Sequence, residues 1–166
     1  MTVITLIGDD GNETKVETAA ISRIRGILPA ERALHEASTR IDQAFIQFVR
    51  DAPRAVADLV KPGFPALTEL ALPNGAPVWF DGSKAKGPLP VPLSEAPRGT
   101  RSALTIGNKT QFVSSSPQEV HDRIAAARGT ALPVPDPARR TPQSASPELQ
   151  EWLAPENVWD ADVPTE

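Results

Sequence analysis

Apolar and polar residues alternate in two short stretches of the chain, from Val3 to Ile7 and from Leu67 to Leu72. Alternation with a period of two places one face of a β-strand against a core. The dipeptides that follow, Asp10-Gly11 and Asn74-Gly75, favour the positive φ angles of a two-residue hairpin turn. We therefore expect two β-hairpins. Their return strands should be Thr14 to Val16 and Val78 to Phe80.

A third hairpin is predicted further along the chain, and it leads into a helix. Ser102 to Ile106 alternates again, Gly107-Asn108 supplies a turn, and Thr110 to Val113 has the pattern of a returning strand. The hydroxyl of Ser116 can accept a free helix N–H, and the proline that follows suits the first helical position. We expect a helix from Pro117 to about Arg128, with Val120 and Ile124 on its buried face.

These features recur at an offset of 64 positions, as in Gln47-Phe48-Val49 and Gln111-Phe112-Val113. A proline follows each triplet at the same spacing, and the turn glycines Gly11 and Gly75 keep the offset. An offset shared by a turn, a strand and a helix start indicates a tandem duplication. We therefore predict a β-rich α+β fold of two tandem hairpin-hairpin-helix modules plus an extended proline-rich C-terminal arm. The expected segments are residues 1–63, 64–128 and 129–166.

The middle of the first module is open to two interpretations. Apolar residues between Pro29 and Asp51 fall at spacings that a helix also satisfies, and many of their neighbours are good helix formers. The register with the second module instead favours strands from Thr39 to Val49. We choose the strands, with room for a short helix within Ala30 to Ser38. In the second module, Lys84 to Pro97 is rich in proline, so we expect an irregular loop there.

Length and composition narrow the class of protein. A chain of 166 residues has room for one ordinary domain or for two very small ones that pack on each other or on partners. Cysteine is absent, which excludes disulfides and thiolate metal sites and fits the cytoplasm, or a virion if a phage encodes the chain. We find neither a signal-peptide pattern nor an apolar run of the roughly 18 to 20 residues that span a membrane.

Charge is distributed unevenly along the chain. The formal net charge is -4, and residues 129–166 carry seven acidic side chains against Arg139 and Arg140, a net charge of -5. The rest of the chain therefore carries about +1, which lacks the basic surface of a nucleic-acid-binding protein. We expect no nucleic acid and no membrane as a partner, but another protein in a homo- or hetero-oligomer.

Candidate catalytic and metal-binding residues are few. His35 and His121 are the only histidines, and neither has a carboxylate or a second histidine at metal-ligand spacing. The acidic run from Asp9 to Glu13 lacks the spacing of a calcium loop and fits a hairpin turn. Ser114-Ser115-Ser116 has no nucleophile motif around it. We therefore expect no enzyme activity, no cofactor and no metal, and both histidines in solvent-facing positions.

Two of the three tryptophans lie in the C-terminal arm, where seven prolines occur in 38 residues. Such a composition cannot form a core and would suit a disordered solubilising tail. However, Ser146-Pro147-Glu148 signals a helix near 147–153, and tryptophan is strongly enriched at binding hot spots. We therefore favour a docking arm. Its expected partner-binding residues are Leu149, Trp152, Leu153, Val158 and Trp159. Trp79 is a further candidate, because it and its strand neighbour Phe80 face opposite sides.

The second module also carries a family resemblance. Its first hairpin with the Asn74-Gly75 turn, the run from Ala103 to Lys109, Phe112-Val113 and the short helix after Ser116 resemble the small flagellar and swarming-motility proteins. Similar modules occur in uncharacterised phage and prophage proteins. The resemblance implies the order hairpin, hairpin, helix, and it brings no catalytic residues. We expect a structural or assembly protein, such as a capsid-decorating or connector-associated phage component that docks through its arm. The alternative is a regulatory protein-binding adaptor of the motility type.

Overall fold

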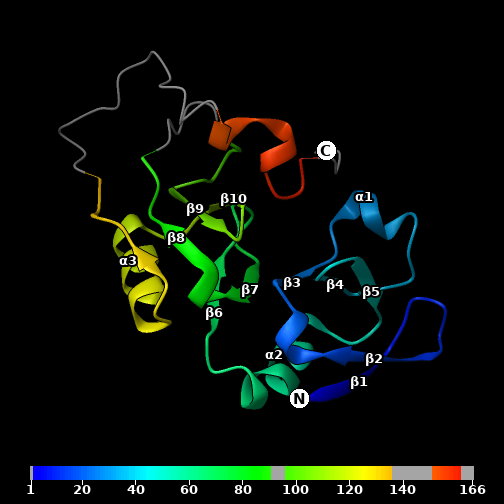
Figure 1. Ribbon diagram of the computed structural model, residues 1–166. Coiled ribbons are helices and arrows are strands. Elements are labelled where there is room, and N and C mark those ends of the chain that lie inside the picture. Colours follow the sequence, from blue (N-terminus) through cyan, green and yellow to red (C-terminus); the bar gives the residue numbers. More distant parts are fainter. Residues whose placement is uncertain (1, 91–95, 136–150, 162–166) are drawn as a thin grey trace. The chain divides into compact units, whose positions relative to one another are not determined.

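The structure is a computed structural model that describes residues 2–90, 96–135 and 151–161. These residues form two compact units (Figure 1). Unit 1 contains the described residues up to Glu69 together with Pro77–Asp81, and unit 2 contains Leu70–Ala76 and the described residues from Gly82 to 161. The protein has several sheets and a few short helices, which confirms the β-rich α+β class that was predicted.

Unit 1 is built on a five-stranded sheet with the strand order β5-β4-β3-β7-β6. A separate two-stranded sheet, β1-β2, meets it through an isolated bridge between Gly8 and Val49. The last two residues of β6 belong to unit 2. In chain order the elements are β1 (Val3–Ile7), β2 (Glu13–Glu17), η1 (Thr18–Ala20), β3 (Arg23–Gly26), α1 (Pro29–Arg32), β4 (Thr39–Asp42), β5 (Ile46–Val49), α2 (Pro53–Val60), η2 (Lys61–Gly63), β6 (Leu67–Ala71) and β7 (Pro77–Asp81).

The hairpins predicted at the two alternating segments form, but their turns are longer than the two residues expected, because the Gly8 amide bonds to the Asn12 carbonyl and the Leu72 amide to the Ala76 carbonyl. β1 pairs with β2 in antiparallel register, and Gly11 in the turn has a φ of 85°. β7 is the neighbour of β6, and Gly75 between them has a φ of 87°. Backbone in this left-handed region is accessible to glycine without strain, so each turn depends on its glycine. The expected return strands are confirmed within β2 and β7.

The ambiguous segment of the first module is confirmed as strands. β4 pairs with β3 on one side and with β5 on the other, so its backbone hydrogen bonds are made within the sheet. Helix propensity differs between residues by less than about 1 kcal/mol, and pairing with burial outweighs it. A helix does form earlier, but α1 has only the four residues Pro29–Arg32.

Each face of the large sheet has a different character. Ile24, Ile41 and Trp79 lie opposite one another on neighbouring strands and share one face of the sheet. Helix α2 packs on this face with its buried residues Val56 and Val60 (Figure 1). Fully burying such a side chain contributes roughly 1.5 to 3 kcal/mol, so this cluster is the main source of stability in unit 1. The opposite face of β3 and β4 carries buried arginines and carboxylates, described below.

Unit 2 contains a four-stranded sheet of order β10-β9-β8-β11, on which α3 packs. The predicted helix is confirmed: it begins at Pro117, and the Ser116 hydroxyl accepts the Glu119 amide at 3.2 Å. Its elements are η3 (Gly82–Lys84), β8 (Ala85–Gly87), β9 (Ser102–Ile106), β10 (Lys109–Val113), α3 (Pro117–Ala126), β11 (Thr130–Ala131) and η5 (Pro155–Asn157).

One expectation about the second module was wrong. Lys84 to Pro97 was predicted to be irregular, but Ala85–Gly87 form the strand β8 between β9 and β11. The prolines that suggested a loop begin only at Pro88, beyond this strand. Residues 91–95 lie outside the described part of the chain.

Several element bounds repeat at the offset seen in the sequence. β2 spans residues 13 to 17 and β7 spans 77 to 81, while η1 spans 18 to 20 and η3 spans 82 to 84. α2 begins at Pro53 and α3 at Pro117, again 64 positions apart. Among the described residues, every helix is too short or too polar to cross a membrane.

Candidate protein-binding site

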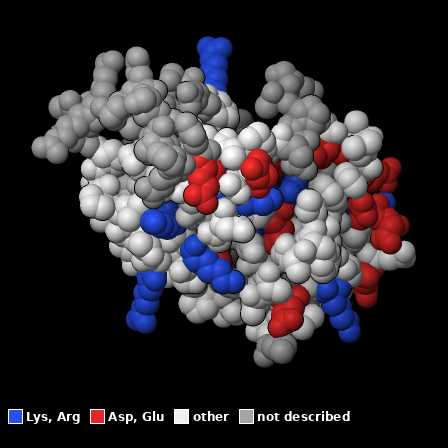
Figure 2. All heavy atoms as spheres, turned by 45° about the horizontal axis from the view of Figure 1, so that its top comes forward, with Lys and Arg blue, Asp and Glu red and all other residues white. Residues whose placement is uncertain are grey.

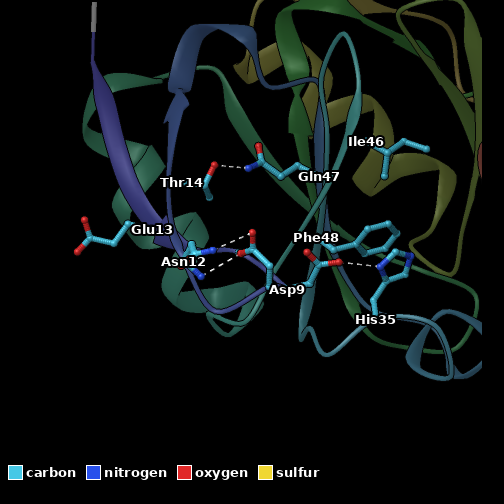
Figure 3. Close-up of a pocket in the computed structure, with 10 residues that line it drawn as sticks. Asp9, Asn12, Glu13, Thr14, His35, Ile46, Gln47 and Phe48 are labelled. Carbon is cyan, nitrogen blue, oxygen red and sulfur yellow. Dashed lines mark hydrogen bonds and ion pairs between the residues drawn. The ribbon is translucent and has the colours of Figure 1, made fainter.

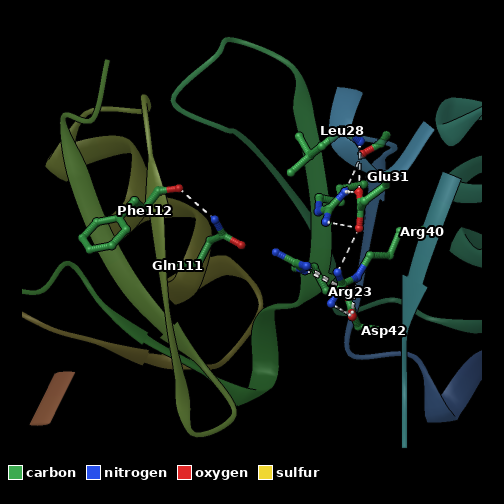
Figure 4. Close-up of polar contacts among 9 residues, drawn as sticks. Arg23, Leu28, Glu31, Arg40, Asp42, Gln111 and Phe112 are labelled. Carbon is green, nitrogen blue, oxygen red and sulfur yellow. Dashed lines mark hydrogen bonds and ion pairs between the residues drawn. The ribbon is translucent and has the colours of Figure 1, made fainter. Parts of the chain in front are cut away.

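A network of buried charges fixes the segment between β3 and β4 in unit 1 (Figure 4). The Glu31 carboxylate accepts hydrogen bonds from Arg25 at 2.7 and 3.0 Å and from Arg40 at 3.0 Å. Asp42 accepts bonds from the Nε atoms of Arg23 at 2.8 Å and Arg40 at 2.9 Å. Arg40 therefore links the two carboxylates. Removing one partner of a buried ion pair typically destabilises by about 3 to 5 kcal/mol.

Glu31 also positions the backbone around it. Its carboxylate accepts the Leu28 amide at 3.0 Å, and its carbonyl accepts the His35 amide at 3.0 Å. Burial acts to raise the pKa of the Glu31 carboxyl, but the hydrogen bonds from Arg25 and Leu28 outweigh it, so this pKa lies below its ordinary value. Glu31 is therefore an ionised anchor for the residues that follow α1.

His35 comes to lie against the β1–β2 turn and β5. Its Nδ1 lies 2.8 Å from the Asp9 Oδ2, and its ring stacks on Phe48 with 3.8 Å between ring centroids. His35 was expected to face solvent, but its side chain is only 30% exposed, and it has a carboxylate partner that its neighbours in the sequence do not supply. The carboxylate comes from a turn 26 positions earlier, which local spacing could not reveal.

Beside this pair lies an open pocket of about 410 Å³ (Figure 3). Acidic and apolar side chains share its wall, and no Lys or Arg is among the residues that line it. The lining residues are Gly8, Asp9, Asp10, Asn12, Glu13, Thr14, His35, Ile46, Gln47 and Phe48. Hydrogen bonds from the Asn12 amide and side chain hold the pKa of Asp10 below its ordinary value, so that carboxylate is ionised at neutral pH.

Exposed apolar residues adjoin the pocket. Ile46 lines it and is 48% exposed, and the neighbouring Phe45, in the turn between β4 and β5, is 62% exposed. Acidic side chains gather at the right-hand edge of the space-filling view (Figure 2), the side on which Figure 1 shows the β1–β2 turn. Exposed apolar groups with polar residues around them are typical of a surface that binds another protein.

The polar groups of the pocket are not arranged for nucleophilic catalysis. Thr14 supplies the one hydroxyl among the lining residues, and it accepts a hydrogen bond from the Gln47 amide. His121 lies in unit 2, where its Nδ1 is 2.8 Å from the Leu132 carbonyl oxygen. Within the described part of the chain, no group of three or more His, Cys, Asp or Glu side chains could hold a metal ion.

Trp79 was predicted to be a partner-binding residue, but it lies in the core of unit 1. Its side chain is fully buried in the cluster beneath α2, and its Nε1 donates to Glu69 Oε1 at 3.1 Å. The guanidinium of Arg54 lies 5.3 Å from the ring centroid. A partner could reach this ring only if unit 1 opened. Phe80 on the other face is fully buried as well.

The predicted docking residues of the arm contact unit 2 itself. Trp152, Leu153 and Val158 pack, partly buried, against the cluster of Leu89, Ala103 and Phe112. The Trp159 amide donates to the Thr110 carbonyl at 2.9 Å, and the ring lies 5.1 Å from the Lys109 ammonium. Of the helix expected near 147–153, residues 151–153 are described and are helical, while Leu149 lies outside the described residues.

Comparison with protein-family models, curated proteins and solved structures finds no match to this chain. The pocket of unit 1 could not be found from the sequence, because its walls come from three separate segments. The one local hint of a surface site in the sequence was the apolar pair Phe45-Ile46. It lies in a segment whose residue pattern fitted both a helix and a strand.

Proposed function

We propose that this chain is a non-enzymatic assembly protein, and that the pocket and the adjoining Phe45-Ile46 pair form its docking surface. The observation that carries the proposal is the exposure of these two side chains beside an acidic pocket wall that no Lys or Arg lines. Large apolar side chains in contact with water are unfavourable, and a partner that covers them gains roughly 25 cal/mol per Å² of apolar surface. Aromatic and aliphatic groups next to a polar rim are the usual centre of such interfaces.

The surface is held in shape before any partner arrives. The stacking of His35 on Phe48 and the Asp9 contact join three segments at the pocket, and Glu31 anchors the chain that leads to His35. A pre-organised surface loses less conformational entropy on binding. Unit 1 therefore has the character of a docking surface that needs little rearrangement.

Charge indicates what kind of partner segment fits. Asp9, Asp10 and Glu13 line the pocket, while the Arg50 guanidinium at its edge donates to the Asp9 carbonyl and pairs with Glu36, each at 3.0 Å. A partner segment with a Lys or Arg next to an apolar residue would match both the acidic and the apolar parts of the surface. Opposite charges steer such an encounter and select against acidic competitors.

Tandem duplication is the second part of this proposal. The repeated bounds of β2 and β7, η1 and η3, and α2 and α3 support two copies of one module. In the first copy β2 pairs with β1 alone, whereas β7 also pairs with β3. The two copies would thus differ in how many strands pair with the return strand of the first hairpin. Superposing residues 3–60 on 67–124 of an experimental structure should align Gly11 with Gly75 and Pro53 with Pro117.

The most specific form of the proposal is a phage particle component, and it derives from the sequence resemblance. A particle component would co-purify with capsids or connectors at a fixed ratio. A regulatory adaptor of the motility type would instead bind a single soluble partner reversibly. Mass measurement of the native complex distinguishes the two.

A pair of matched substitutions tests the docking surface. Ile46 and Leu59 are each 48% exposed, but Leu59 lies on α2. Ile46→Asp should lower affinity for the native partner about 30-fold, which corresponds to a loss of about 2 kcal/mol for a hot-spot residue. Leu59→Asp should bind as the unaltered chain does. If both variants, folded by circular dichroism, enter the native complex equally well, the docking surface lies elsewhere.

A further inference from the structure

We propose that residues 151–161 form an exchangeable arm, which occupies the outer edge of β10 in its own chain and the same edge of a second copy in the assembled protein. This inference concerns unit 2 and does not depend on the pocket of unit 1. The partner to which it commits is another copy of this chain.

β10 is an edge strand, and the arm is what pairs with its outer side. In the order β10-β9-β8-β11, β10 has a strand neighbour on one side only. On the other side, Thr110 forms a parallel bridge with Val158, and the Thr110 carbonyl accepts the Trp159 amide at 2.9 Å. An open strand edge is a template for an added strand, from the same chain or from another.

Side chains make the edge specific for this segment. Leu89, Ala103 and Phe112 form an apolar cluster that takes up Val158 together with Trp152 and Leu153. The Lys109 ammonium lies 5.1 Å from the Trp159 ring centroid, within the range of a cation–π contact. The edge therefore recognises an extended Val-Trp segment preceded by a short apolar helix.

The contact within one chain is short. The backbone of the arm meets β10 in one isolated bridge and one hydrogen bond, from the Trp159 amide to the Thr110 carbonyl. The Thr110 hydroxyl is buried without a hydrogen-bond partner among the described residues. A buried hydroxyl without a hydrogen-bond partner is unfavourable. The arm is held on β10 by few backbone hydrogen bonds, so it can dissociate from this strand edge.

The connecting sequence allows the arm to reach another copy. From Asp136 to Glu148 the sequence contains no apolar residue other than proline and the two alanines Ala138 and Ala145. Sixteen residue steps separate Pro135 from Glu151, and an extended chain spans at most about 3.3 to 3.6 Å per residue, or roughly 55 Å in all. Exchange replaces each contact by an identical one, so protein concentration decides which copy is occupied.

The absence of cysteine makes the test direct. One preparation carries Thr110→Cys and a second, of different mass, carries Val158→Cys, the two positions that form the bridge. The preparations are mixed, incubated and oxidised. We expect a disulfide-linked heterodimer whose yield rises with concentration and at least fivefold above that of a control pair, Thr110→Cys with Leu59→Cys. A chain with both Thr110→Cys and Val158→Cys should close within itself at low concentration.

Two results would overturn the proposal. One is heterodimer no more abundant than in the control pair at millimolar concentration, although the double variant closes within itself. The other is a double variant that does not close, which would mean that the arm does not lie on β10. Sedimentation equilibrium of the cysteine-free chain provides a second measurement, in which a concentration-dependent dimer should disappear in Trp152→Ala/Trp159→Ala. A dimer that persists in that variant also refutes arm exchange.

Discussion

The imidazole of His35 lies 2.8 Å from the carboxylate of Asp9, although 26 positions separate the two residues in the chain. The contact brings the segment after α1 against the β1–β2 turn and closes one side of the pocket (Figure 3). The side chains are 30% and 40% exposed, so water screens their interaction. Its main effect is on the shape of the pocket, not on the stability of unit 1.

Asp9→Asn should therefore lower the free energy of unfolding by less than about 1 kcal/mol, as is usual for an exposed ion pair. Urea unfolding of the variant and the unaltered chain measures this difference. A loss of 3 kcal/mol or more would mean that the pair supports the fold itself.

Stacking of His35 on Phe48 predicts a spectroscopic signature. With 3.8 Å between ring centroids and 14° between planes, the ring current of Phe48 should shift the His35 ring protons upfield in NMR spectra. Phe48→Leu should remove that shift. His121, which contacts a backbone carbonyl in unit 2, serves as the internal control and should not change.

Substitutions of two glutamates allow the stability contribution of a buried ion pair to be compared with that of an exposed one. Glu31 pairs with Arg25 and Arg40 and its side chain is 8% exposed, whereas Glu36 pairs with Arg50 and is 84% exposed. Glu31→Gln should destabilise by about 3 to 5 kcal/mol, because it leaves buried guanidinium groups without their carboxylate. Glu36→Gln should change stability by less than about 1 kcal/mol. Equal effects of the two substitutions in calorimetric unfolding would contradict the buried network.

The same network predicts how stability depends on pH. The pKa of Glu31 in the folded chain lies below its ordinary value of 4.5, so folding favours the ionised form. This contribution is fully present above pH 4.5 and is lost as pH falls through the lower folded pKa. The stability gap between the unaltered chain and Glu31→Gln should therefore be widest near neutral pH and narrow in acid. A gap that stays constant from pH 7 to pH 3 would show that the Glu31 carboxylate contributes no charge-dependent stability.

Substitutions of Trp79 and Phe45 should have different effects on stability, because Trp79 is a core residue and Phe45 a surface residue. Trp79→Ala should destabilise unit 1 by about 3 to 5 kcal/mol, because the ring is fully buried beneath α2. Phe45→Ala should leave stability within about 0.5 kcal/mol, because that ring is 62% exposed. Thermal unfolding of both variants measures the difference. A stable, fully folded Trp79→Ala protein would return Trp79 to the list of partner-binding residues.

Much of the fold could be predicted from short-range sequence features. Turn glycines such as Gly11 and Gly75 require positive φ angles that other residues avoid, so they mark hairpins in the sequence itself. Ser116 and Pro117 mark a helix start for an equally local reason, since they satisfy the first turn of α3. The offset of 64 positions resolved the ambiguity of β4 and β5, where local propensity alone favoured a helix.

The sequence by itself determined which segments form hairpins and helices, because turn and capping preferences act between residues a few positions apart. Only the tertiary structure decided which segments far apart in the chain contact each other. These contacts determine the surroundings of Trp79, His35 and Trp159. Trp79 became a core residue because β7 pairs with β3 opposite Ile24. His35 gained Asp9, and Trp159 gained Thr110, through contacts between segments far apart in the chain. Such contacts depend on how long-range packing closes the chain, and a pattern that repeats every two or four residues does not encode them.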